Sequence, residues 1–157
     1  MQKVLPFLWF DGCAEEAAEF YAGTFDGCRV VDITRYGEGG PAPAGSVLTV
    51  SFEIQGQPFV GLNGGPHYQF TPAVSFLVNC QTQDEIDRTW ARLADGGQPL
   101  QCGWITDRFG VTWQIVPEAL QGMLFSPDKA ASARAMAAMM QMVKLDLPAL
   151  QRAFDGR

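Results

Sequence analysis

Apolar residues in this chain are grouped either as short β-rich runs or as stripes with helical spacing. The first runs predict a strand over 4–10 and, further on, strands over 28–36, 46–54 and 57–62. Between the first two strands, residues 13–25 carry a single apolar stripe with helical spacing. We therefore expect the first part of the chain to form one strand, one helix and three strands. The stripe of this predicted helix consists of Ala14, Ala17, Ala18, Tyr21 and Phe25.

The same order of elements begins again after Pro72. Residues 73–80 predict a strand, and Thr82 with Glu85 forms a capping box at the start of a helix that runs to about residue 94. Further strands follow and end in the segment 102–117. The chain is therefore predicted to contain an internal structural repeat, defined by the order of its elements.

The segment 102–117 predicts a strand, a tight turn at 107–110 and a second strand. Because side chains alternate along a strand, Thr112, Gln114 and Val116 share one face and Trp113 and Ile115 share the other. We expect Trp113 and Ile115 to face the helix. The opposite face then directs Gln114 into the space that the sheet encloses.

Residues after 118 predict a helical tail. Residues 120–125 are interpreted as a link, and 126–128 as a helix start with Ser126 as the cap. A stripe of alanine, methionine and valine predicts packing against the body of the protein or against a partner subunit. Asp146 is expected to cap a last short helix. The stripe consists of Ala133, Met136, Ala137, Met140 and Val143.

Composition indicates a folded globular chain, since 47% of the 157 residues are hydrophobic and 18% are charged. We expect one domain over 1–157, with a first module at 3–63, a second at 72–118 and the tail at 126–155. The net charge of −6 argues against a nucleic-acid partner. The sequence shows neither a membrane span nor a signal peptide, so a cytoplasmic location is expected. The four cysteines are widely spaced and are expected to be reduced thiols.

Four separated motifs carry a resemblance to a known family. They are Pro-Phe-Leu-Trp-Phe-Asp-Gly at 6–12, Arg-Tyr-Gly at 35–37, Leu-Asn-Gly-Gly-Pro at 62–66, and the segment 102–114. In this order they resemble the vicinal oxygen chelate superfamily of glyoxalases, bleomycin-resistance proteins and dioxygenases. Within it, the chain is similar to the PhnB-like subgroup, often labelled 3-demethylubiquinone-9 3-methyltransferase. The resemblance extends over nearly the whole chain, including the tail.

The resemblance implies an α+β fold. Two βαβββ modules would form a curved, partly closed sheet around a cavity, followed by the C-terminal helical tail. Members of this superfamily are commonly homodimers, so a homodimer is expected.

The metal chemistry of the superfamily does not carry over. Its metal-dependent members place histidine and glutamate ligands at positions that fall near Pro6, Thr49, Ala73 and Gln114 of this sequence. The first strand of each module supplies no histidine or carboxylate near these positions, and Gln114 stands where a glutamate is expected. A neutral amide is a weak ligand for a divalent ion, so the usual metal site is expected to be absent.

The methyltransferase label also lacks support in the sequence. A Rossmann-type cofactor site needs a glycine-rich turn between a strand and a helix. The glycine-rich stretch 37–45 lies between two predicted strands instead.

Two functions stay open at this point, and a dimeric scaffold without a small ligand is a weaker third. The first is a protein that binds a small organic molecule in the sheet cavity. The second is an enzyme with an atypical metal or none, in which His67, the only histidine, acts as the base. The cavity is expected to be lined by Leu8, Thr49, Ser51, Ser75, Thr112 and Gln114, with Asn63, His67 and Trp104 near its rim.

Overall fold

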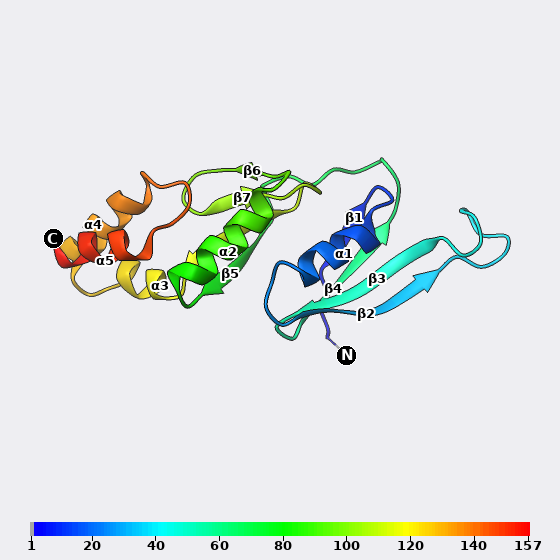
Figure 1. Ribbon diagram of the computed structural model, residues 1–157, viewed down its shortest axis with the longest axis horizontal. Coiled ribbons are helices and arrows are strands. Elements are labelled where there is room, and N and C mark those ends of the chain that lie inside the picture. The colour runs from blue at the N-terminus through cyan, green and yellow to red at the C-terminus, as the bar shows by residue number, and fades with distance from the viewer. Residues whose placement is uncertain (1) are drawn as a thin grey trace. The chain divides into compact units, whose positions relative to one another are not determined.

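The computed structural model describes residues 2–157. The chain divides into two compact units, and the division falls between Phe70 and Thr71. Each unit contains one four-stranded sheet and is described by itself (Figure 1).

The first unit confirms the predicted strand, helix and three strands. Its sheet has the order β1-β4-β3-β2, in which β1 runs parallel to β4 and the other neighbours are antiparallel. The first strand begins later than predicted, although the backbone N–H of Val60 already bonds to the carbonyl of Pro6 at 3.0 Å. The elements are β1 (Phe7–Phe10), α1 (Ala14–Ala22), β2 (Cys28–Arg35), β3 (Val47–Ile54) and β4 (Gln57–Asn63).

The second unit repeats this topology. Its sheet has the order β5-β8-β7-β6, and β5 runs parallel to β8 as β1 does to β4. Thr82 caps α2 as predicted, because its Oγ1 accepts the Glu85 N–H at 3.2 Å. The Glu85 carboxylate also reaches back, but it accepts the N–H of Gln81 at 2.7 Å, one residue before the N-cap that a capping box would use. The elements are β5 (Ser75–Cys80), α2 (Gln83–Ala94), β6 (Gln98–Pro99), β7 (Trp104–Thr106) and β8 (Thr112–Pro117).

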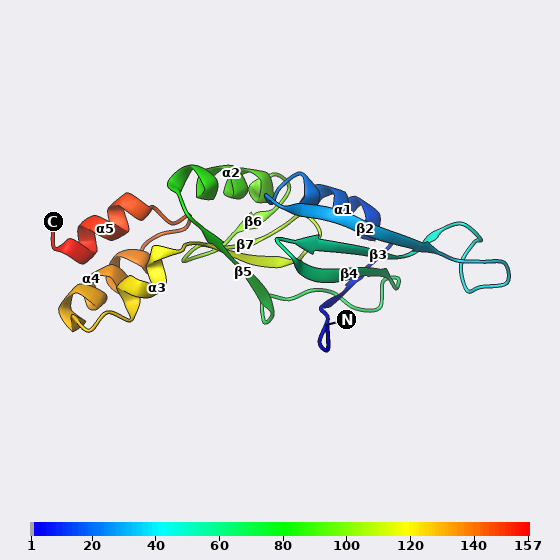
Figure 2. The same cartoon turned by 90° about the horizontal axis from the view of Figure 1, so that it is seen from below.

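Each helix buries one apolar stripe against its own sheet. In the first unit, Tyr21 of α1 packs on Phe52 with ring centroids 5.7 Å apart. In the second unit, Trp90 of α2 is buried, as are Trp113 and Ile115 on β8. Figure 2 shows α2 along one face of its sheet, which leaves the opposite face for Gln114, as predicted.

The tail contains three helices, α3 (Ala119–Leu124), α4 (Lys129–Met139) and α5 (Leu147–Asp155). The interpretation of 120–125 as a link was therefore wrong. Asp128, and not Ser126, caps α4 by accepting the Ala131 N–H at 3.0 Å. Asp146 caps α5 as predicted, with its carboxylate 2.8 Å from the Ala149 nitrogen.

Of the two packing roles predicted for the methionine stripe, packing against the body of the chain was wrong, and packing against a partner subunit stays a prediction. The buried residues of α4 are Ala131, Ser132 and Ala135, whereas Met136, Met140 and Val143 are 42%, 54% and 40% exposed. The hydroxyl of Ser132 donates to the Met123 carbonyl at 2.9 Å, and this bond fixes the rotation of the helix. Small side chains allow α4 to approach its neighbours closely, so the alanine face packs inward and the methionine face points outward. Ala133 and Ala137 are likewise exposed.

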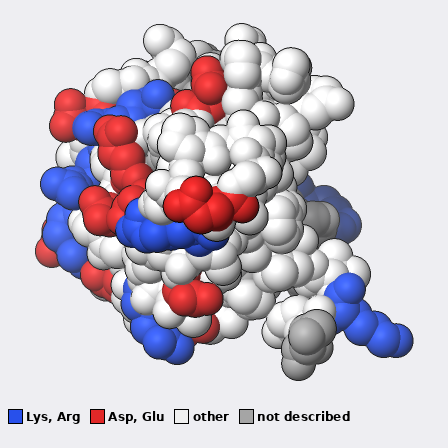
Figure 3. Space-filling model, turned by 90° about the vertical axis from the view of Figure 1, so that its right-hand side faces the viewer, with Lys and Arg blue, Asp and Glu red and all other residues white. Residues whose placement is uncertain are grey.

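No helix among residues 2–157 has both the length and the apolar character needed to cross a membrane. Figure 3 shows one face of the surface, on which acidic and basic side chains are interspersed and not separated by sign.

Candidate functional site

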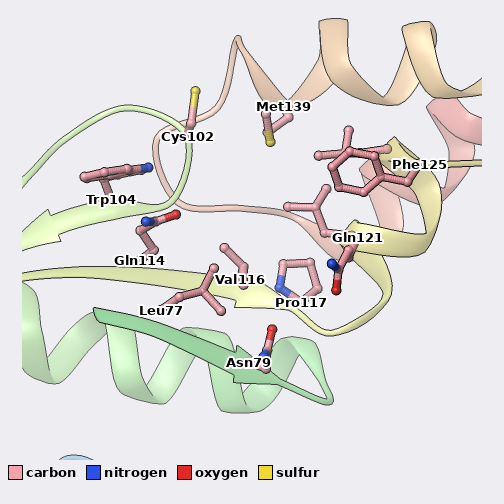
Figure 4. Close-up of a pocket in the computed structure, with 12 residues that line it drawn as sticks. Leu77, Asn79, Cys102, Trp104, Gln114, Val116, Pro117, Gln121, Phe125 and Met139 are labelled. Carbon is pink, nitrogen blue, oxygen red and sulfur yellow. The ribbon is translucent and has the colours of Figure 1, made fainter. Parts of the chain in front are cut away.

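A pocket of about 500 Å³ lies in the second unit, on the sheet face opposite α2 (Figure 4). Its sheet side is built by a row of three cross-strand neighbours, in which Gln114 of β8 pairs with Leu77 of β5 and with Trp104 of β7. Strand alternation places all three side chains on this face. The residues that line this side are Leu77, Asn79, Cys102, Trp104, Gln114 and Val116.

The sequence predicted four site residues in this unit, and the structure places them on this one face. Gln114 Nε2 donates to Ser75 Oγ at 2.9 Å. Thr112 is buried, and its hydroxyl lies 3.3 Å from that of Thr106. Trp104 and Gln114 line the pocket directly. Ser75 and Thr112 form the next cross-strand pair on the same face, two residues before Leu77 and Gln114 on their strands.

The helical tail builds the second side of the pocket. This contribution was missed because residues 120–125 were interpreted as a link, although Leu120 and Met123 have the i, i+3 spacing of a buried helix face. The tail residues that line this side are Leu120, Gln121, Leu124, Phe125 and Met139, and Pro117 at the end of β8 completes the lining.

Backbone hydrogen bonds hold the tail against the start of β7. Cys102 N–H donates to the Met142 carbonyl at 2.9 Å, and Gly103 N–H donates to the Val143 carbonyl at 2.7 Å. Gly103 has φ +82°, and a Cβ there would lie 2.9 Å from both the Ile115 carbonyl oxygen and the Leu145 side chain. A glycine is therefore required where the tail meets the sheet.

The helix on the far side of the sheet also holds the tail. Gln83 Nε2 donates to the Leu145 carbonyl at 3.1 Å, and Gln83 Oε1 accepts the Leu147 N–H at 2.7 Å. Lys144 Nζ lies 2.6 Å from the Asp87 carboxylate, and this hydrogen bond lowers the pKa of Asp87 below its ordinary value. The position of the pocket wall thus depends on α2 as well as on the sheet.

The pocket lining contains three carboxamides, two sulfur side chains and apolar groups, but no charged residue and no histidine among the described residues. Divalent cations are usually held by several carboxylate, imidazole or thiolate ligands, and this lining offers only the Cys102 thiol, so the donor set does not fit one. Across residues 2–157, no group of three or more histidine, cysteine, aspartate or glutamate side chains is arranged to hold a metal ion.

The remaining predicted site residues belong to the first unit. Thr49 Oγ1 lies 2.5 Å from the hydroxyl of Thr34. Asn63 Oδ1 accepts the Ala14 N–H at 2.9 Å, and Asn63 Nδ2 donates to the Val47 carbonyl at 3.1 Å, so its amide is used within this unit. His67 is exposed in the loop after β4. Leu8 is buried and Ser51 is half-buried.

Comparison with known proteins identifies a family. Residues 2–116 match the model of a family described as 3-demethylubiquinone-9 3-methyltransferase. A PhnB protein from Bacillus cereus is 38% identical, with a TM-score of 0.68, over 74% of this chain and 99% of its own. Protein PA1353 from Pseudomonas aeruginosa (23% identity, TM-score 0.62) is matched over 75% of this chain and 98% of its own, and shares the fold. None of the curated proteins matches the chain.

The family match ends at residue 116, before Leu120, the first residue of the tail that lines the pocket. The resemblance therefore covers less of the chain than the sequence pattern indicated. About a quarter of this chain also lies outside the match to the Bacillus cereus protein, which is itself covered almost completely. The second wall of the pocket thus lies beyond the part of the chain that the family model describes.

Proposed function

This chain belongs to the 3-demethylubiquinone-9 3-methyltransferase-like (PhnB) family, and from that premise we propose that it binds a small organic molecule in the pocket of its second unit. The observation that carries the proposal is the pocket itself. It has the volume of a site for a small ligand, a largely apolar lining and a few polar groups that converge on it. Its floor is the sheet face to which Gln114 was assigned from the sequence, and it includes Trp104, which was expected near the rim.

We propose further that the ligand binds without a divalent metal. The support is the donor set, in which Gln114 occupies the place of an acidic ligand and already donates to Ser75. Elemental mass spectrometry tests this on protein incubated with manganese, zinc, nickel or iron. Retention below about a tenth of an equivalent is expected for a site without charged ligands. One tightly held equivalent per chain would overturn this part of the proposal.

The binding proposal is tested by a ligand screen that reads out thermal stabilisation, because a bound ligand raises the melting temperature of the folded state. Each hit is then measured on Leu77→Trp, in which a large side chain from β5 fills the pocket beside Gln114. Val31→Trp is the matched control, since Val31 is a strand residue of the first unit and is 51% exposed, against 52% for Leu77.

Hits that are lost in Leu77→Trp and kept in Val31→Trp are the expected result. A screen without hits, or hits that bind equally to both variants, would reject the pocket as the binding site. The homodimer and the cytoplasmic location stay predictions that light scattering and cell fractionation would test.

A further inference from the structure

The two ends of the pocket differ in chemistry (Figure 4). At one end, Trp104 and Gln114 offer a flat aromatic surface beside a carboxamide. At the other end, helix α3 and the end of α4 offer mainly hydrocarbon and thioether surface from Leu120, Leu124 and Met139, with the Gln121 carboxamide beside it. A ligand that fills the whole pocket must therefore match a polar end and an apolar end.

At the polar end, Gln114 is oriented by its neighbour. Because its Nε2 donates to Ser75 Oγ at 2.9 Å, its Oε1 is left to accept a hydrogen bond. Figure 4 shows this oxygen on the side of the side chain that faces the pocket. The matching group on a ligand is an N–H or O–H donor. The ring of Trp104 suits a flat group next to that donor.

At the apolar end, part of the pocket wall is tightly packed against the core and part of it is exposed to solvent. Leu120 belongs to a buried cluster with Val116 and Leu145, against which Leu124 and Met139 pack. Phe125, in contrast, is 76% exposed although it lines the pocket. Apolar surface of this kind gains free energy when a hydrocarbon group covers it. This end therefore suits an alkyl or similar hydrocarbon arm.

The absence of charge from the described lining adds a third restriction. An ionised group on the pocket floor would lose water without gaining a counter-charge, which is unfavourable. The net charge of −6 adds to this cost for an anion. An uncharged hydrogen-bonding group loses far less, because a carboxamide can replace its water.

We infer that the pocket selects uncharged ligands that combine a flat hydrogen-bond-donating head, held by Gln114 and Trp104, with a hydrocarbon arm along α3 and α4. This inference rests on the proposed binding function and specifies its ligand class. The arm-binding surface comes from residues beyond 116, outside the family match, so it is a property of this chain's own tail.

Three probes separate the two parts of the inference, with affinities measured by titration calorimetry on the full chain at pH 7.5. They are 4-butylbenzamide, 4-butylbenzoate and benzamide. Butylbenzamide is expected to bind at least about tenfold more tightly than benzamide, because the butyl arm covers apolar surface. It is also expected to bind at least about tenfold more tightly than butylbenzoate, which is charged and lacks the donor.

Two variants, each with a matched control, show which residues cause the affinity gains from the butyl arm and from the amide head. Phe125→Ala is expected to reduce the gain from the butyl arm several-fold, whereas Met136→Ala, on the outward face of α4, leaves it unchanged. Gln114→Met is expected to remove most of the preference for the amide head. Gln151→Met leaves that preference unchanged, because Gln151 bonds only to Asp155 within α5.

The outcomes distinguish this inference from the function on which it rests. Butylbenzoate that binds as tightly as butylbenzamide, with both lost in Leu77→Trp, would overturn the ligand class and leave the binding function standing. Failure of all three probes to bind would also overturn the ligand class. The screen with Leu77→Trp would then decide the binding function separately.

Discussion

Gln83 on α2 accepts the backbone N–H of Leu147 at 2.7 Å, so a helix on one face of the second sheet holds the tail that closes the pocket on the other face. The same carboxamide donates to the Leu145 carbonyl at 3.1 Å. Leu145 itself is fully buried. The link therefore couples the stability of the tail to the shape of the pocket.

Gln83→Ala is expected to lower the free energy of unfolding by about 1–3 kcal/mol, because two backbone groups of the tail lose their partner. Urea unfolding followed by circular dichroism measures the change. Gln151→Ala is the control, since Gln151 is exposed and its side chain bonds to Asp155 within α5, and it should cost less than about 0.5 kcal/mol. Equal effects of the two substitutions would show that Gln83 does not anchor the tail.

Asp107 is a second buried organising group, in the turn between β7 and β8. Its Oδ1 accepts the N–H groups of Phe109 and Val111 at 2.8 and 3.0 Å, and its Oδ2 accepts the indole N–H of Trp113 at 2.9 Å. Asp107→Ala is expected to cost about 2–4 kcal/mol, because three donors, two of them in buried hydrogen bonds, lose their acceptor. Thermal and urea unfolding both report this loss.

Asp95→Ala is the matched control, because the Asp95 side chain is 81% exposed and pairs with Arg108 at the surface. Such a pair contributes less than about 1 kcal/mol. If Asp107→Ala is no more harmful than Asp95→Ala, the turn does not depend on the buried carboxylate.

The sheet face of the pocket could be predicted from the sequence, whereas its tail wall could not. Alternation along β8 is a local rule, so it placed Gln114 opposite Trp113 correctly. The rotation of α4 about its axis decides which of its faces is buried. This rotation depends on a tertiary contact, the hydrogen bond from the Ser132 hydroxyl to the Met123 carbonyl, which no local sequence pattern reveals. Apolar spacing predicted that the stripe with Met136 and Met140 packs against the body of the protein or a partner subunit, but within the chain the smaller Ala131 and Ala135 form the buried face.

The role expected for Asn63 shows a related difficulty. A carboxamide at a strand end, beside glycines, resembles a ligand-binding group in the sequence. In the structure it caps a helix that begins 49 residues earlier, because Cys13, at the N-cap position of α1, provides no side-chain hydrogen bond there. Sequence spacing gives no sign of such a distant cap.

Asn63→Ala is accordingly expected to cost about 1–2 kcal/mol, the usual effect of losing a helix cap. Asn63→Asp should be milder, because a carboxylate still accepts the Ala14 N–H and is favoured near a helix N-terminus. Chemical unfolding of both variants, together with the affinity for a pocket ligand, separates this role from ligand binding. An unchanged stability with a lost ligand would contradict the capping role.

Cys28, at the start of β2, provides a test that depends on pH. Burial, with a smaller contribution from the Glu53 carboxylate, raises the pKa of the Cys28 thiol from 9.0 to about 11. A raised pKa favours the neutral thiol in the folded state, so its contribution to stability is full below pH 9 and is lost as the pH rises toward 11. At pH 8 only roughly one thiol in a thousand is ionised, and the thiolate is the reactive form.

Alkylation of Cys28 by iodoacetamide, followed by peptide mass spectrometry, is therefore expected to be slow at pH 8. The rate should rise about tenfold per pH unit up to pH 10, in proportion to the thiolate fraction. Glu53→Gln removes the repelling charge and should increase the rate at pH 8, whereas Glu16→Gln, on the exposed side of α1, should not. A rate at pH 8 equal to that of a free thiol in a short peptide would show that burial does not protect Cys28.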